Sequence, residues 1–212
     1  MASSRGFSSG VPGQTVTFMD AALTGVPDLA LPIRIAATVF VALLTAAAAQ
    51  VSVPLPFTPV PFTLQPMVVL LTAAVIGPEL AMLSQVLYLS AGVLGLPVFA
   101  FSPELPQGAA RLLGPTGGYL MSYPLAAYTT GWLARRRFDR RYFTSVLAMA
   151  AGLAVVFAGG VSWLTIFAPG ADARSLGAAL AVGFYPFILA DVFKLCVAGA
   201  VMPAAWRLLG RS

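Results

Sequence analysis

Six apolar runs, bounded by proline, glycine or arginine, dominate this sequence and restrict what it can fold into. They cover residues 33–49, 62–76, 80–94, 116–133, 142–168 and 176–202. Only 9% of the 212 residues are charged, whereas a soluble domain carries about 25%. Apolar runs of this kind form helices in a bilayer, where every backbone polar group needs a partner within its own segment. The sequence therefore predicts an all-α integral membrane protein, a bundle of six transmembrane helices.

Proline and glycine set the boundaries between the runs. Residues 51–61 contain four prolines, which remove backbone donors and favour extended backbone, so this stretch is predicted to be a loop. Gly77 and Pro78 separate the second run from the third and indicate a tight turn. Both of these runs are short for a hydrocarbon core of about 30 Å.

The N-terminal segment differs in composition from the rest of the chain. Residues 1–31 are rich in glycine, serine, threonine and proline, and we interpret them as a flexible cytoplasmic tail. Residues 32–212 are then expected to form one transmembrane domain. Arg34 and the apolar stretch after it imitate a secretory signal peptide, but their distance from Met1 and the later spans argue against cleavage.

The arginines indicate the orientation of the bundle. Five of them follow the fourth run, within residues 135–141. Six spans put both termini on one side, and from residue 34 onward a cytoplasmic assignment places eight arginines inside, against Arg111 and Arg174 outside. This distribution follows the positive-inside rule and predicts cytoplasmic N and C termini. The loops at 51–61 and 95–115 would then share the outer face.

Two ionisable residues lie inside the last apolar run. Asp191 and Lys194 are three residues apart, so on a helix they share one face. An ionisable side chain at membrane depth is costly unless it is paired or faces a polar cavity. Together the two offer an acceptor and a donor, which suits a small ligand with both N–H and C=O groups. The alternative is an ion pair that only neutralises itself.

Weaker candidates stand near two other helix starts. Thr116 and Gly117 belong to a glycine-rich turn whose free N–H groups can meet a carboxylate or carbonyl, or which only allows close helix packing. Tyr119 adds an amphipathic wall with a hydroxyl group. Thr63 and Gln65 can hydrogen-bond a neutral polar ligand or cap their own helix.

Small residues recur every four positions on the first helix, at Thr38, Ala42 and Ala46. Such a stripe lets another helix approach closely, either within this chain or from a partner. Gln85, in the third run, is interpreted as an interhelical hydrogen-bonding residue rather than a ligand contact.

Several function classes lack the residues they require. The chain has no histidine, which removes imidazole metal sites and histidine general bases, and we expect no cofactor. Lys194 is the only lysine and Leu195 follows it, so the chain has no phosphate-binding loop of the form GxxxxGK followed by serine or threonine. Asp191 is the only acid inside the runs, whereas intramembrane aspartyl chemistry needs two. Neither an enzyme nor a nucleic-acid-binding protein is expected.

Four motifs, in this order, resemble those of the BioY family. They are the segments 60–65, 92–100 and 114–119, followed by Asp191 with Lys194. BioY proteins are the biotin-specific substrate-binding components (S components) of energy-coupling factor (ECF) transporters. The resemblance runs from about residue 33 to residue 203 and implies a six-helix domain in the bacterial cytoplasmic membrane. The vitamin site would lie near its outer face, under the loop after the first helix.

The resemblance also implies partners and site residues. Family members work with a transmembrane coupling subunit and two ATPase subunits, and some are proposed to transport alone. The stripe Thr38, Ala42 and Ala46 would dock the coupling subunit. Asp191, Lys194, the glycine-rich turn and Tyr119 would bind the ligand, with Thr63 and Gln65 as further contacts.

Biotin has a ureido group, an apolar bicycle and a carboxylate, and these features fit the residues. Asp191 would accept from a ureido N–H and Lys194 would donate to the ureido oxygen. Tyr119 and Phe62 would cover the rings, and the carboxylate would lie near loop donors such as Thr63 or Arg111. An S component for another vitamin and a structural membrane protein with a self-neutralising pair remain alternatives.

Overall fold

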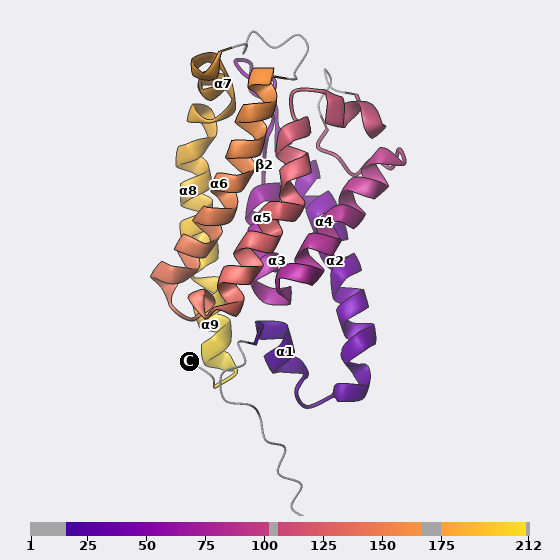
Figure 1. Ribbon diagram of the computed structural model, residues 1–212, viewed down its shortest axis with the longest axis vertical. Coiled ribbons are helices and arrows are strands. Elements are labelled where there is room, and N and C mark those ends of the chain that lie inside the picture. The colour runs from indigo at the N-terminus through magenta and orange to yellow at the C-terminus, as the bar shows by residue number, and fades with distance from the viewer. Residues whose placement is uncertain (1–15, 102–105, 167–174, 211–212) are drawn as a thin grey trace, which may run out of the picture.

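The computed structural model describes residues 16–101, 106–166 and 175–210, which form a helical bundle with one short β-hairpin (Figure 1). The α-helices are α1 (Phe18–Leu23), α2 (Ala30–Gln50), α3 (Gln65–Ile76), α4 (Pro78–Val93), α5 (Gly117–Arg135), α6 (Tyr142–Ile166), α7 (Leu176–Gly183), α8 (Tyr185–Gly199) and α9 (Val201–Leu208). Short 3-10 helices are η1 (Pro27–Leu29), η2 (Gly108–Leu113) and η3 (Phe138–Arg140). The hairpin pairs β1 (Ser52–Val53) with β2 (Phe62–Thr63) in antiparallel register.

The helices agree with the prediction of an all-α membrane protein. Three segments of the described chain are long and apolar enough to cross a membrane, namely Pro27–Gln50, Tyr142–Ile166 and Tyr185–Leu208. The helix α3 has only 12 residues, which at 1.5 Å per residue is about 18 Å. The second run is therefore as short as the sequence suggested.

The last apolar run is not one helix, which corrects the prediction. The helix α7 ends at Gly183, and α8 begins two residues later with Pro186 in its first turn. Because Pro186 has no N–H, the carbonyl of Val182 loses its helical partner. The N–H of Phe187 donates to the Phe184 carbonyl at 3.0 Å instead. The break therefore leaves the carbonyls of Val182 and Gly183 without helical hydrogen bonds.

Part of the predicted tail 1–31 is folded, which is a second correction; residues 1–15 lie outside the described residues. In α1 the Thr17 hydroxyl accepts from the Asp20 N–H at 3.1 Å, and the Asp20 carboxylate accepts from the Thr17 N–H at 3.3 Å. Asp20 also pairs with Arg34 of α2 at 2.7 Å, and the ring of Phe18 packs edge-on against Trp206 of α9. Composition missed this helix because capping and one buried face need no long apolar run.

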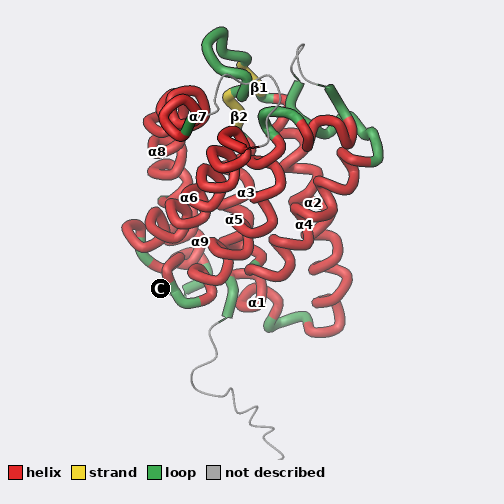
Figure 2. Tube along the Cα trace, turned by 45° about the horizontal axis from the view of Figure 1, so that its top comes forward, coloured by secondary structure: helices red, strands yellow, loops and turns green. Residues whose placement is uncertain are grey.

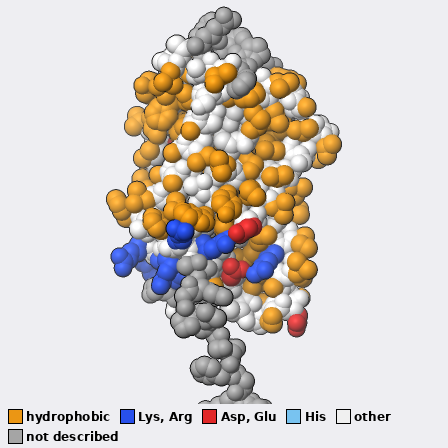
Figure 3. All heavy atoms as spheres, in the orientation of Figure 1, with side chains coloured by type: hydrophobic (Ala, Val, Ile, Leu, Met, Phe, Trp, Pro, Cys, Tyr) orange, Lys and Arg blue, Asp and Glu red, His pale blue; other side chains and the backbone are white. Residues whose placement is uncertain are grey.

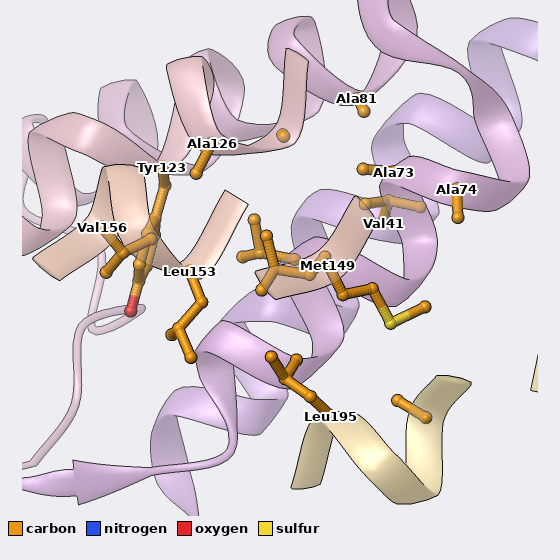
Figure 4. Close-up of a cluster of buried hydrophobic side chains, with 14 of the residues drawn as sticks. Val41, Ala73, Ala74, Ala81, Tyr123, Ala126, Met149, Leu153, Val156 and Leu195 are labelled. Atoms are coloured by element: carbon orange, nitrogen blue, oxygen red, sulfur yellow. The ribbon is translucent and has the colours of Figure 1, made fainter. Parts of the chain in front are cut away.

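The core lies where α2 to α6 meet α8, and Figure 4 shows side chains contributed by each of these helices. Small residues allow the helices to approach closely, and Ala73 and Ala126 are fully buried in the core. The predicted interhelical role of Gln85 is confirmed, because its amide donates to the Thr45 hydroxyl of α2 at 3.2 Å.

The small-residue stripe of α2 packs within this chain. Thr38 and Ala42 are buried, and Ala46 is half-buried against the core. The outward face of α2 instead exposes large apolar side chains such as Phe40 and Leu43. This burial agrees with the alternative of packing inside the chain, and docking of a coupling subunit at the stripe stays a prediction.

The two ends of the bundle differ in character. The helices α1 and α9 lie at one end, whereas the β-hairpin and α7 lie at the other (Figure 1, Figure 2). Basic side chains gather at the end that holds α1 and α9, below a surface rich in hydrophobic side chains (Figure 3). Two of the arginines used to predict the orientation, Arg174 and Arg211, lie outside the described residues.

Substitution of Gly77 tests how the one-residue turn between α3 and α4 is built. Gly77 has φ 85°, and a Cβ there would lie 2.6 Å from Cγ2 of Thr17. Gly77→Ala is expected to lower the free energy of unfolding by about 2 kcal/mol, as measured by denaturant titration in detergent. The control Gly25→Ala has nothing within 4 Å of its added Cβ. Equal stability of the two variants would contradict this account of the turn.

Candidate ligand-binding site

A cavity lies among α3, α5, α6, α8 and the end of the proline-rich loop. Its empty volume is about 580 Å³, part of which is open solvent at its mouth. Seven predicted ligand residues line it: Phe62, Thr63, Gln65, Arg111, Thr116, Tyr119 and Asp191. Lys194 and Gly117 are not among the lining residues.

Asp191 faces this cavity from α8 and is held by Lys194. Both side chains are buried, and they form a direct ion pair one turn apart on the helix. The Lys194 ammonium also donates to the Thr63 carbonyl at 2.9 Å and lies 4.1 Å from the centre of the Phe62 ring. Lys194 therefore has two protein acceptors, the Asp191 carboxylate and the Thr63 carbonyl. Its expected donation to a ligand stays a prediction.

The wall built by β2 and α3 is fixed by a chain of hydrogen bonds. Thr63 pairs with Ser52 in the hairpin, and its hydroxyl donates to the Gln65 side-chain oxygen at 3.4 Å. The Gln65 amide donates in turn to the hydroxyl of Tyr88 at 2.7 Å. Tyr88 is itself buried on α4, so it anchors Gln65 from behind the cavity.

The break between α7 and α8 supplies two acceptors that hold other parts of the site. The Tyr119 hydroxyl donates to the freed Gly183 carbonyl at 2.7 Å. The Thr58 hydroxyl, in the proline-rich loop, donates to the freed Val182 carbonyl at 2.6 Å. The helix irregularity caused by Pro186 therefore fixes both the α5 wall and the loop that ends at the cavity.

Arg111 is a buried charge with donors to spare. Its side chain is 1% exposed, and one guanidinium nitrogen donates to the Ala100 carbonyl at 2.8 Å. The other two nitrogens have no hydrogen-bond partner among the described residues, nor does the buried hydroxyl of Thr116. Burial lowers the pKa of Arg111, because desolvation disfavours the charged form. An anion entering the cavity would satisfy these donors.

The glycine-rich turn has a packing role. A Cβ at Gly117 would lie 1.8 Å from the Leu112 carbonyl oxygen, so only glycine allows this approach of η2 to α5. The indole of Trp163 on α6 donates to the Gly114 carbonyl at 3.0 Å and fixes the turn. Of the two turn residues predicted to bind a ligand, Thr116 reaches the cavity and Gly117 does not.

Aromatic residues that sequence reasoning missed complete the cavity. Tyr123, Phe157 and Phe187 line it from α5, α6 and α8. Tyr123 lies four residues after Tyr119, and helical spacing could have placed both on one face. Phe157 stands in a run without charged residues and Phe187 in the first turn of α8, and neither has a sequence signal that separates it from ordinary core residues. In Figure 4, Tyr123 and Val156 lie side by side among the core residues, so the cavity borders the core.

Sequence comparisons identify relatives over most of the chain. A family model described as the BioY family matches residues 19–211. A protein of Thermotoga maritima named "Biotin transporter BioY" is 38% identical over 79% of this chain and 91% of its own length. A Pyrococcus horikoshii protein named "Probable biotin transporter BioY" is 41% identical over 82% of this chain and 93% of its own length.

Comparison with solved structures gives the same fold. The crystal structure described as the S-component for biotin from an ECF-type ABC transporter matches with a TM-score of 0.70. The match covers 84% of this chain and 92% of that chain at 23% sequence identity. The two chains therefore share the arrangement of their helices.

The ion pair on α8 makes a prediction about stability. Lys194→Met leaves the Asp191 carboxylate buried without a counter-charge and should lower the free energy of unfolding by about 3–5 kcal/mol. The double variant Lys194→Met/Asp191→Asn removes both charges and should recover most of that loss. Thermal and denaturant unfolding in detergent measure both variants. A double variant less stable than Lys194→Met would contradict the pairing.

Proposed function

The chain belongs to the BioY family, and we propose that it binds biotin and serves its uptake as the S component of an ECF-type transporter. The observation that carries this proposal is the cavity that holds both a lysine-bound carboxylate, Asp191, and a guanidinium with unpartnered donors, Arg111. The names of the relatives support the choice of biotin. Transport without further subunits is a variant of the same proposal.

The cavity's chemistry matches the parts of biotin. Lys194 is the only polar partner of Asp191 among the described residues, so Asp191 can still accept from a ureido N–H. Lys194 pairs with that carboxylate and holds it in place, rather than contacting the ureido oxygen itself. Phe62 of β2 and Tyr119 of α5 both line the cavity and offer apolar surface to the bicycle.

Arg111 is the proposed partner of the biotin carboxylate. Its free Nε or its free Nη1 can donate to a carboxylate oxygen, and the Thr116 hydroxyl can add another donor. A carboxylate would also offset the cost of an unpaired buried guanidinium. Arg111 lies in η2 and Asp191 in α8, so the two polar ends of the ligand would meet different elements of the cavity wall.

We further propose six membrane spans with both termini in the cytoplasm of a bacterium. The spans would be α2, α3, α4, α5, α6 and the α7–α9 run, with shorter helices extended by loop residues. The gathering of basic side chains at the end with α1 and α9 supports this orientation. Assembly with a transmembrane coupling subunit and two ATPase subunits, within the lipid bilayer, is inherited from the family alone.

Equilibrium binding of labelled biotin to the purified protein in detergent tests the proposed function. We expect saturable binding that excess unlabelled biotin displaces and that excess thiamine or riboflavin does not. Displacement by another vitamin would make the chain an S component for that vitamin. Folded protein that binds none of the three would contradict the transport function.

Replacement of Arg111 tests how the carboxylate is held. Arg111→Gln should weaken biotin binding about 10- to 100-fold, because a hydrogen-bonded charge pair is worth about 1.5–3 kcal/mol. Biotin amide, which has no carboxylate charge, should bind the wild type weakly and lose little further affinity in the variant. Calorimetric titration of both ligands against both proteins gives the coupling free energy between Arg111 and the biotin carboxylate. An equal loss for the two ligands would place the carboxylate elsewhere.

Thr58→Val tests the loop contact, because it removes one hydroxyl while keeping the side-chain shape. The Val182 carbonyl would lose its donor, the Val60 N–H would lose the hydroxyl that it bonds at 3.1 Å, and the loop that ends at the cavity would open more often. We expect biotin to dissociate about fivefold faster or more, because one hydrogen bond is worth about 1 kcal/mol. Thr129→Val is the matched control, since within the described part of the chain the Thr129 hydroxyl bonds only to the Leu125 carbonyl of its own helix, α5. An unchanged dissociation rate in Thr58→Val would contradict the proposal that this hydroxyl holds the loop over the cavity.

A further inference from the structure

Four exposed arginines form a surface, here called the basic end, where α5, α6 and α9 meet η3. They are Arg136, Arg137, Arg141 and Arg207. Among the described residues none of them forms an ion pair with a carboxylate. The acidic residue in the turn, Asp139, is buried and 2% exposed. No carboxylate among residues 16–101, 106–166 and 175–210 therefore offsets the positive charge of the basic end at the surface.

Contacts beneath this surface keep the arginines together. Asp139 accepts a hydrogen bond from the Trp206 indole, and the Arg140 guanidinium stacks 3.4 Å from the centre of the same ring. These contacts join η3 to α9, so Arg207 stays beside the turn. Arg137 adopts φ 73°, a conformation in which glycine is the usual residue after a helix. Arg137 thus occupies a position where glycine would have a lower backbone conformational energy.

Exposed aromatic side chains lie next to the basic end. Trp132 is one turn before Arg136, whose guanidinium stacks 3.6 Å from the centre of the indole. Tyr142 and Phe143 open α6 and are 47% and 72% exposed. Beyond them the surface is mostly apolar (Figure 3). Aromatic and basic side chains at the ends of apolar helices are typical of the headgroup layer of a bilayer.

We propose that the basic end binds the phosphate groups of anionic phospholipids. Guanidinium groups bind phosphate through paired hydrogen bonds, and several unpaired ones match a layer of negative headgroups. A zwitterionic lipid carries its own cation and gains less from this surface. The surface runs directly into the apolar, aromatic-edged band, which favours a lipid over a second protein. The inference does not depend on the proposed function.

Lipid retention by the purified full-length protein tests the inference. The protein is incubated in detergent with equal amounts of phosphatidylglycerol and phosphatidylcholine, and bound lipids are counted by native mass spectrometry. The wild type should retain phosphatidylglycerol in preference. Arg136→Gln/Arg137→Gln/Arg141→Gln should reduce that preference about tenfold or more, since each basic residue contributes about fivefold near an anionic surface.

The control is Arg34→Gln, in which the lost guanidinium was already paired with Asp20. Its lipid preference should stay close to that of the wild type. Equal retention of the two lipids by the wild type, or an undiminished preference in the triple variant, would overturn the inference. Displacement of phosphatidylglycerol by an equal concentration of inorganic phosphate would also overturn it. If the triple variant does not fold, the single variant Arg137→Gln should show a several-fold weaker preference, and an unchanged preference would overturn the inference.

Discussion

The ion pair between Asp191 and Lys194 is the interaction on which the rest of the site depends. A lone charge among apolar helices is expensive, so removing either residue leaves the other as a costly unpaired charge. Lys194 also reaches the Thr63 carbonyl and lies over the Phe62 ring, which ties α8 to the hairpin strand β2. One pair of charges thus places an acceptor in the cavity and fixes the strand that forms its edge.

A second constraint comes from a missing hydrogen bond. Pro186 breaks the last apolar run and frees the Val182 and Gly183 carbonyls, which would otherwise be used within a helix. In an apolar surrounding these acceptors need donors, and the hydroxyls of Thr58 and Tyr119 supply them. The same break that shortens the helix therefore joins the proline-rich loop and the α5 wall to α7.

The sequence predicted what hydropathy and rare residue types control. The apolar runs predicted most helices, four prolines excluded a helix at 51–61, and the isolated acid and lysine of the last run identified Asp191 and Lys194. It did not predict α1, which depends on capping and on contact with Trp206, or the break at Pro186. The engagement of Lys194 with Thr63 joins residues 131 positions apart. Residues so far apart in the sequence meet only through helix packing, and a local sequence pattern does not predict such contacts.

The most direct measurement is calorimetric titration of biotin into the wild type, Asp191→Asn and the neutral double variant Asp191→Asn/Lys194→Met, all in one detergent. The double variant contains no unpaired buried charge, so a loss of biotin affinity in it reflects the missing Asp191 carboxylate and not a loss of stability. The account predicts that both variants bind biotin about 10- to 100-fold more weakly than the wild type, while the double variant unfolds at nearly the wild-type temperature. Wild-type affinity in the folded double variant would contradict the role of Asp191 as the ligand's acceptor.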